Sequence, residues 1–277
     1  MPGVYISELA GIQCSIEHTP TVEKIEELHL KSGYMSQIHQ HPDAAELMFI
    51  DRGAGSVRVR EENYPVHEGD LVVYNAGEFH REVFLRSGDP PCVYALRLQK
   101  LRIYGSRDGE LLSDGLPPVF HTHAYRGLIL QGMQTILEAV GKEGDYFQRV
   151  TERVASAMVL LVMLLSNDEN AVYESASEKT PFEQIKAFIE RNYTQQISIR
   201  RMADALHVNY YYMSHLFKEK MGISMKTYII QCRIWEAAML LRETDLPIQE
   251  IGRRVGYSNQ SHFNVQFRSI NGATPLA

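Results

Sequence analysis

Residues 199–206 read IRRMADAL and residues 248–255 read IQEIGRRV, so the same spacing of apolar and small residues returns after 49 positions. A second pair follows at an offset of 50, with MSHLFK at residues 213–218 and FNVQFR at residues 263–268. In both copies the apolar residues recur at the period of a helix with one buried face. The carboxy-terminal part of the chain therefore contains an internal repeat, and each copy predicts two short helices joined by a turn.

Each copy also has the small residue and the turn residue that a helix-turn-helix unit needs. Ala203 and Gly252 stand where two helices must cross closely. The turn that follows requires a left-handed backbone, which Gly256 adopts without steric cost. His207 holds the matching place in the first copy, and histidine is among the residues that tolerate this conformation. The pattern therefore predicts a tight turn after the first helix of each copy.

The second helix of each copy is expected to begin at a polar cap and to be held by its apolar face. Asn209 and Ser258 are good N-cap residues for these helices. The apolar positions behind them are Met213, Leu216 and Phe217 in the first copy, and Phe263 and Phe267 in the second. One copy alone fits an all-α packing domain equally well. Two copies, joined by a long helix that contains Arg233, Ala237 and Leu241, favour a DNA-binding domain.

The charge of the chain is divided unevenly. From Thr180 to the end there are 12 Lys and Arg against 8 Asp and Glu, whereas the first 179 residues hold 16 against 26. The overall net charge of −6 therefore hides a basic carboxy-terminal part. Such asymmetry indicates two domains with different partners, and the basic domain is the one expected to bind nucleic acid.

The second copy of the repeat resembles the AraC/XylS family of regulators. The residues that carry this resemblance are Ile251, Gly252, Gly256, Tyr257, Phe263, Phe267, Arg268, Gly272 and Pro275. The sequence departs from the family pattern in having Gly252 where alanine is usual and Val265 where a basic residue is common. It also stops at Ala277, where the family continues into a Tyr-Arg pair. The resemblance implies a sequence-specific DNA-binding transcriptional regulator, more often an activator than a repressor, and not an enzyme.

The resemblance further implies that the second helix of each unit enters the major groove, with the two helices about one turn of DNA apart. The implied DNA-binding residues are Tyr210, Tyr211, Ser214, His215 and Lys218 in the first unit, and Asn259, Gln260, Ser261, Asn264 and Arg268 in the second. Gln260 or Asn264 could contact adenine, and Val265 could pack on a thymine methyl group. The arginines of the supporting helices either contact phosphates or form a solvated surface; they are Arg200, Arg201, Arg253 and Arg254.

The amino-terminal part has a different pattern. Residues 22–98 alternate short β-rich runs with turn signals, which favours a small β-barrel or sandwich. A first set of residues stands at the spacing of the first motif of the cupin β-barrel, which it resembles: Gly33, His39, His41, Glu46 and Gly53. A second, incomplete motif consists of Gly69, Asn75, Gly77 and His80, with Asn75 where proline is usual.

The spacing of these polar residues suggests one site. His39 and His41 are two positions apart, so on a strand both would point inward, and Glu46 and His80 would reach the same cavity from neighbouring strands. Three imidazoles and a carboxylate could hold zinc, nickel, iron or manganese. The same groups could instead contact a small-molecule effector, or fill the barrel without any ligand. The resemblance favours an effector, a carbohydrate above all, and enzymatic turnover is the least favoured because no second catalytic constellation accompanies the histidines.

The chain is thus expected to be an α+β protein of four parts. Residues 1–123 form a cupin-like effector-sensing domain, residues 124–166 a helical dimerisation segment, residues 167–180 a polar linker, and residues 181–277 an AraC-type DNA-binding domain with two helix-turn-helix motifs. Within residues 1–123, His121 and His123 form a further pair that is expected to lie in a surface turn.

The expected protein is a cytoplasmic homodimer that binds double-stranded promoter DNA, a small-molecule effector and RNA polymerase. No signal peptide is apparent, no apolar stretch reaches the ~20 residues that span a bilayer, and three scattered cysteines fit a reducing compartment. The alternative is a metal-dependent cupin enzyme or metal sensor fused to a DNA-binding domain. An interaction protein without DNA binding is a third interpretation.

Overall fold

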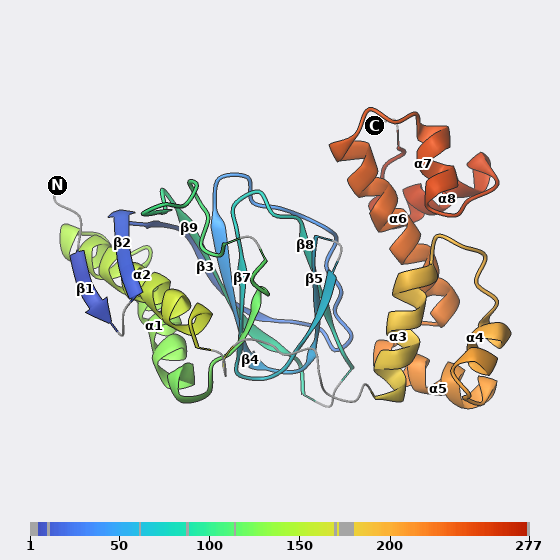
Figure 1. Ribbon diagram of the computed structural model, residues 1–277, viewed down its shortest axis with the longest axis horizontal. Helices are drawn as coiled ribbons and strands as arrows, with labels where there is room; N and C mark the ends of the chain where they lie inside the picture. Colours follow the sequence, from blue (N-terminus) through green and yellow to red (C-terminus); the bar gives the residue numbers. More distant parts are fainter. Residues whose placement is uncertain are drawn as a thin grey trace. The chain divides into compact units, whose positions relative to one another are not determined.

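The structure is a computed structural model that describes residues 5–9, 12–60, 62–86, 89–113, 115–168, 171 and 180–275. It divides into two compact units, Met1–Ser175 and Ala176–Ala277. The first is rich in strands and the second is helical (Figure 1), as the α+β prediction requires. The linker predicted at residues 167–180 lies for most of its length outside the described residues.

The described part of the first unit contains three antiparallel sheets (Figure 1). One has the order β11-β7-β4-β9-β3, with β11 at Val119–His121, β7 at Asp70–Tyr74, β4 at Ala45–Arg52, β9 at Cys92–Gln99 and β3 at Thr21–His29. A second has the order β6-β5-β8, with β6 at Glu62–Val66, β5 at Gly55–Val59 and β8 at His80–Phe84. A third joins β1 at Tyr5–Leu9, β2 at Ile12–His18 and β10 at Arg102–Ile103.

The five-stranded sheet buries both of its faces. Along β4, Met48 and Ile50 join the core that also contains Val57 and Val59 of β5, so one face is turned towards the second sheet. The alternate residues Leu47 and Phe49 belong to the other core, which the helices cover. Because successive side chains of a strand point to opposite faces, a strand buried on both sides is apolar almost throughout.

Two helices cover the outer face of this sheet. They are α1, at Arg126–Ala139, and α2, at Asp145–Ser166, preceded by the short 3₁₀ helix η1 at His123–Tyr125. Figure 1 shows both helices together on the side of the barrel where β1 and β2 lie. A side chain at Gly132 would come within 2.5 Å of the sulfur of Met158, so glycine permits the close approach of α1 to α2.

His121 does not lie in the surface turn that the sequence predicted. It ends β11, which pairs with β7 so that His121 lies opposite Asp70. Its Nδ1 is 2.7 Å from the buried carboxylate Oδ1 of Asp70. Local sequence could not show this contact, because it depends on the pairing of two strands far apart in the chain.

The second unit consists of six helices in the described residues. They are α3 at Pro181–Asn192, α4 at Ile199–Ala205, α5 at Tyr210–Met221, α6 at Met225–Glu243, α7 at Ile248–Arg254 and α8 at Gln260–Asn271. The two turns of the repeat have the predicted left-handed backbone, with φ of 53° at His207 and 94° at Gly256. Asn209 caps α5 by accepting from the N–H groups of Tyr211 and Tyr212.

The cap of α8 differs from the prediction. Asn259, not Ser258, is the N-cap, and its Oδ1 accepts a hydrogen bond of 2.9 Å from the N–H of His262. The helix therefore begins one residue later, because the one-residue insertion in the second copy falls between the turn at Gly256 and the cap. Asn209 and Asn259 are then equivalent, at the offset of 50 that the rest of each second helix follows.

Candidate functional site

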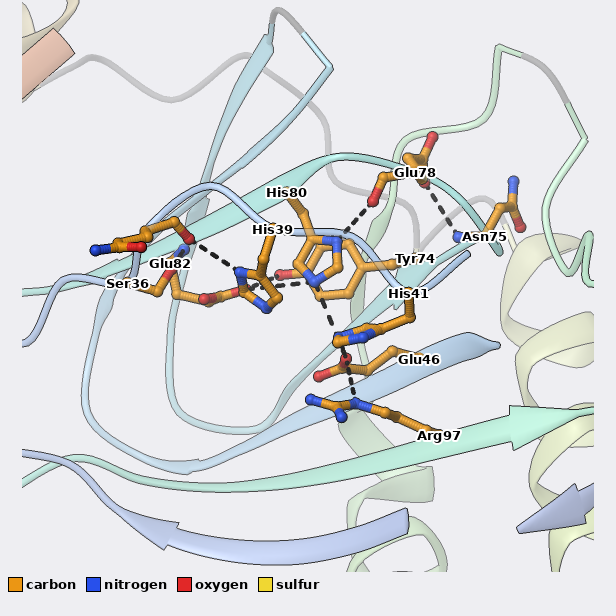
Figure 2. A network of polar contacts seen from close by, with 11 residues as sticks. Ser36, His39, His41, Glu46, Tyr74, Asn75, Glu78, His80, Glu82 and Arg97 are labelled. Carbon is orange, nitrogen blue, oxygen red and sulfur yellow. Dashed lines mark hydrogen bonds and ion pairs between the residues drawn. The ribbon is translucent and has the colours of Figure 1, made fainter. Parts of the chain in front are cut away.

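The polar residues predicted from the cupin-like motifs converge between the five-stranded sheet and the β6-β5-β8 sheet (Figure 2). Glu46 lies on β4 and His80 begins β8, so they come from different sheets rather than from neighbouring strands. His39 and His41 were predicted to lie on a strand, and this prediction was wrong: both lie in the irregular segment between β3 and β4. Two backbone hydrogen bonds between His39 and His80, of 2.9 and 3.1 Å, hold this segment against β8.

The three imidazoles are close enough to share one ligand. Their ring centroids are 4.3 Å apart for His39 and His80, 5.3 Å for His39 and His41, and 5.4 Å for His41 and His80. One nitrogen from each ring lies within 4.8 Å of the others. The sequence motif therefore brings all three histidines together, although its assumption of a strand at His39 and His41 was wrong.

Two of the rings have a defined tautomer. Nδ1 of His39 is 2.9 Å from the carbonyl oxygen of Gln37, and Nδ1 of His80 is 2.8 Å from that of Glu78. A carbonyl only accepts hydrogen bonds, so each Nδ1 carries a proton, and the lone pair available for a ligand is the one on Nε2. This is the arrangement by which proteins orient histidines that ligate metals.

The Nε2 atom of His80 has no hydrogen-bond partner among the described residues. The His80 side chain is only 1% exposed, and its Nε2 is 3.9 Å from both Glu46 Oε2 and Glu82 Oε1. A buried polar atom without a partner costs free energy, so such an atom at a candidate site indicates that something else binds there. The donor set thus fits a divalent metal ion as well as a hydroxyl or carboxylate of a small molecule.

Glu46 is the charged centre of the cluster. Its Oε2 is 2.7 Å from Nε2 of His41 and accepts a hydrogen bond of 3.3 Å from Nε of Arg97. Burial raises the pKa of Glu46, but the hydrogen bond from His41 and the neighbouring positive charges outweigh it and hold the pKa below its usual value. Glu46 is therefore an anion at neutral pH.

His80 is neutral under the same conditions. Burial lowers its pKa to about 4, and the neighbouring His39 acts in the same direction. Its ring stacks on Tyr74, with centroids 3.8 Å apart and an interplanar angle of 10°. The site thus combines one paired carboxylate with neutral imidazole, which suits polar or metal ligands.

Three residues of the site were not predicted from the sequence. Arg97 lies opposite Glu46 in the β4–β9 register, Glu82 is buried two residues after His80, and the Tyr74 hydroxyl donates to Glu82 Oε1 over 3.3 Å. Burial raises the pKa of Glu82. The alternation of His80 and Glu82 along one strand was a visible signal for Glu82, whereas Arg97 depends on strand register.

In the second unit, the predicted DNA-binding residues of the first copy lie at the start and along the outer side of α5. Tyr210, Tyr211, His215 and Lys218 are exposed and Ser214 is half-buried. Tyr211 is 77% exposed, which is unusual for so large a ring and leaves it available for a partner. Tyr212, which the prediction left out, is exposed as well.

The corresponding residues of the second copy lie on α8. Ser261, Asn264 and Arg268 are exposed, while Gln260 is half-buried and donates a hydrogen bond of 3.1 Å to Asn264 Oδ1. Asn259 is exposed but its side-chain oxygen is used as the helix cap. Val265 is 63% exposed on the same helix, whereas Phe263 and Phe267 are buried on the opposite face. An exposed aliphatic residue among amides suits contact with a thymine methyl group.

The arginines near these helices differ in role. Arg200, Arg201, Arg253 and Arg254 are exposed. Arg253 and Arg254 contact Glu250 over 3.5 and 3.3 Å, and such solvated pairs are weak enough to exchange for phosphate.

Arg233 of α6 instead acts within the fold. Its Nε and Nη2 donate hydrogen bonds of 2.6 Å to the carbonyl oxygens of Tyr193 and Gln195, and its guanidinium lies over the ring of Tyr257. Arg233 therefore links the end of α3 to the turn of the second copy.

Comparison with known proteins agrees with this division of the chain. A helix-turn-helix domain family matches residues 202–277, and a cupin domain family matches residues 26–94. The uncharacterized HTH-type transcriptional regulator YdiP of Escherichia coli (strain K12) is 26% identical, with 86% of this chain and 78% of that protein covered. The arabinose operon regulatory protein of the same organism is 25% identical, with 81% and 76% covered.

Among solved structures, the C-terminal domain of AraT, a response regulator from Geobacillus stearothermophilus, is 32% identical. The match covers 36% of this chain and 84% of that chain, with a TM-score of 0.34. None of the described helices is both long enough and apolar enough to cross a membrane.

Proposed function

We propose that the chain, which matches a cupin domain family ahead of a helix-turn-helix domain family and resembles regulators of the AraC/XylS family, reads promoter DNA with α5 and α8 under the control of a ligand held in the barrel. Effector sensing is assigned to residues 1–123, dimerisation to 124–166, the linker to 167–180 and DNA binding to 181–277. The protein acts in the cytoplasm, and contact with RNA polymerase would make it an activator.

The observation that carries the DNA-binding proposal is the matched pair of exposed helix faces. Each of the two helices follows a left-handed turn, begins at an asparagine cap and buries its apolar side. Lys218 lies in the last turn of α5 and Arg268 in the last turn of α8, where both are placed for phosphates. His215 and Asn264 lie about one turn closer to the start of their helices, where side chains of a recognition helix reach base edges.

The barrel cluster supports a small polar effector. Glu46 and the imidazoles can accept hydrogen bonds from hydroxyl groups, and Arg97 can donate to an oxygen of the ligand. A carbohydrate matches this mixture, and one relative is named for the arabinose operon. Ligand binding would alter the populations of two states of the protein that differ in DNA affinity.

A divalent metal ion in the same barrel is the second candidate. The unpartnered Nε2 of His80 and the carbonyl-fixed Nδ1 atoms of His39 and His80 favour it. His39, His41 and His80 would hold the ion together with Glu46, and the ion would supply a positive charge that anchors an anionic effector. A cupin enzyme or a metal sensor fused to a DNA-binding domain would use the same residues, but we propose no turnover.

Dimerisation through the helical pair is a further part of the proposal. Leu128 of α1 and Tyr146 of α2 are exposed, as is Val140 between the two helices, and apolar groups of this size in water favour association. Light scattering of the full chain at micromolar concentration should give twice the monomer mass. A monomeric mass would remove dimerisation from the account without affecting DNA binding.

One set of measurements distinguishes the effector proposal from the metal proposal. Metal content is determined on the purified chain, and wild type is compared with His39→Ala and His41→Ala in a reporter assay with candidate sugars. Loss of inducer response without bound metal supports an effector site alone. Bound metal that both variants lose supports the metal site, whereas variants that respond like wild type would overturn both.

A further inference from the structure

A second group of metal-ligating side chains lies on the face of the five-stranded sheet opposite the histidine cluster. His29 of β3 and Cys92 of β9 are directly opposite each other in the antiparallel register. Glu27 precedes His29 by two residues and so points to the same face. Arg97 of β9 is an odd number of positions from Cys92, so it points to the opposite face, where it contacts Glu46 of the barrel cluster. The two groups therefore cannot share a ligand.

The donor atoms of this second group are already near the spacing of a tetrahedral zinc site. Glu27 Oε1 is 3.2 Å from His29 Nε2 and 3.8 Å from Cys92 Sγ, and all three atoms lie within 4.8 Å of one another. With zinc bonds of about 2.0–2.3 Å, tetrahedral geometry places neighbouring donor atoms roughly 3.4–3.6 Å apart. The two pairs that include Glu27 need adjustments of only a few tenths of an ångström, and His29 Nε2 and Cys92 Sγ, which are at most 4.8 Å apart, need to approach by about 1.3 Å or less.

The burial of the three residues also suits a metal site at a surface. Cys92 is only 1% exposed, whereas the side chains of His29 and Glu27 are 63% and 35% exposed. The sulfur atom is thus held in a buried position, and a cation can reach it between the two side chains that are exposed to solvent. β3 is an edge strand of its sheet, which leaves a fourth position open to water.

Burial and nearby negative charge favour the protonated, unreactive thiol of Cys92 when no metal is bound. Burial raises the pKa of the Cys92 thiol, Glu27 and Asp51 act in the same direction, and Arg52 opposes them. A cation placed against the sulfur would displace its proton, because thiolate is the form that binds metals. Without a metal, the contact between Glu27 and His29 is an ordinary exposed pair of little energetic value.

We propose that Glu27, His29 and Cys92 form a second metal site, which binds Zn²⁺ or a similar thiophilic divalent cation. A thiolate, an imidazole and a carboxylate together select such ions over magnesium and calcium. The bound ion would tie β3 to β9 at the end of β3, from which the chain continues to His39 and His41. This site stands independently of DNA binding and of the effector.

Cobalt(II) titration of the full chain tests this site by a signal that the barrel cluster cannot produce. Thiolate coordination gives a charge-transfer band in the near ultraviolet, whereas the barrel cluster offers imidazole and carboxylate groups without sulfur. One equivalent of cobalt should produce the band, and Zn²⁺ should abolish it. Cys92→Ser should remove the band, and His29→Gln should weaken cobalt binding roughly 100-fold or more, since even outer partners of a metal site contribute 10–100-fold.

Two matched variants control the experiment. His18→Gln changes another exposed histidine, on β2, and His41→Gln changes the barrel cluster; both should keep the band. His29→Gln alters an exposed side chain, so it keeps the test valid even if Cys92→Ser does not fold. Absence of the band in wild type, its persistence in Cys92→Ser, or unchanged affinity in His29→Gln would overturn the proposal.

Discussion

Replacing Gly256 by alanine should destabilise the helical unit, whereas the matched replacement of Gly252 should not. Gly256 has a φ of 94°, and a side chain there would collide with the carbonyl oxygen of Thr194 and come within 3.0 Å of Cζ of Arg233. Gly252 lies inside α7, where an added Cβ would come 3.1 Å from Oε1 of Gln260 and 3.5 Å from Cγ of Phe263. The first contact is tight, but the end of the half-buried Gln260 side chain can move by the few tenths of an ångström that it requires. The two substitutions add the same methyl group four residues apart.

The expected changes in the free energy of unfolding have opposite signs in the two variants. A left-handed backbone costs a residue with a Cβ roughly 1–2 kcal/mol, and a methyl group forced into a packed contact costs about 1–3 kcal/mol more. Gly256→Ala should therefore lower the free energy of unfolding by about 2–5 kcal/mol, and Tm by roughly 10 °C or more for a domain of this size. Gly252→Ala should raise it by up to about 1 kcal/mol, because alanine is the better helix former.

Differential scanning calorimetry of the full chain measures both variants against wild type. Fluorescence anisotropy with bound DNA then shows whether the loss of stability also weakens binding at a temperature near the transition. Equal melting temperatures for the two variants would refute the assignment of Gly256 to a packed left-handed turn. A stabilised Gly256→Ala protein would refute it more strongly.

Four further predictions concern the DNA-binding unit and the barrel. Arg233→Met removes two charge-assisted hydrogen bonds to backbone carbonyls and should lower the unfolding free energy by about 2–4 kcal/mol, which urea denaturation measures; a loss under 0.5 kcal/mol would show that these bonds are not formed. Lys218→Ala and Arg268→Ala should weaken binding to all DNA sequences alike, and each should reduce the slope of log K against log salt by about 1. Asn264→Ala should instead relax base preference at one position, and a uniform loss would place its side chain on phosphate. The pKa of His80 is lowered from 6.5 to about 4 in the folded state. The unfolded state therefore binds more protons than the folded state between these two pH values. As the pH falls through this window, the free energy of unfolding should decrease by about 3 kcal/mol. In metal-free buffer His80→Asn should flatten this decline, and an unchanged pH profile would assign it to other groups.

The helical unit could be predicted well because its constraints are local. A left-handed turn needs glycine or a tolerant residue, and both Gly256 and His207 appear at the expected places. The cap of α8 was misplaced by one residue, since Ser258 and Asn259 are both good caps and only the geometry of the turn selects between them. Tyr212 was omitted because a run of three tyrosines gives no periodic signal for which rings are exposed.

The barrel site could be predicted only in part. The spacing of His39, His41, Glu46 and His80 brought the right side chains together, although the histidines lie on an irregular segment rather than on a strand. Arg97 could not be predicted, because its contact with Glu46 depends on the register of two strands some fifty residues apart. The same limit applies to Glu27, His29 and Cys92, whose convergence follows from the pairing of β3 with β9.

A footprint on selected DNA tests the central claim, that α5 and α8 read neighbouring stretches of one face of the duplex. Binding sites are first selected from random duplexes with the full chain, and methylation interference is then mapped for wild type and for Asn264→Ala. Wild type should show two clusters of contacts about 10 base pairs apart, and Asn264→Ala should lose contacts in one cluster alone. A single cluster, or equal loss from both clusters in Asn264→Ala, would contradict the account.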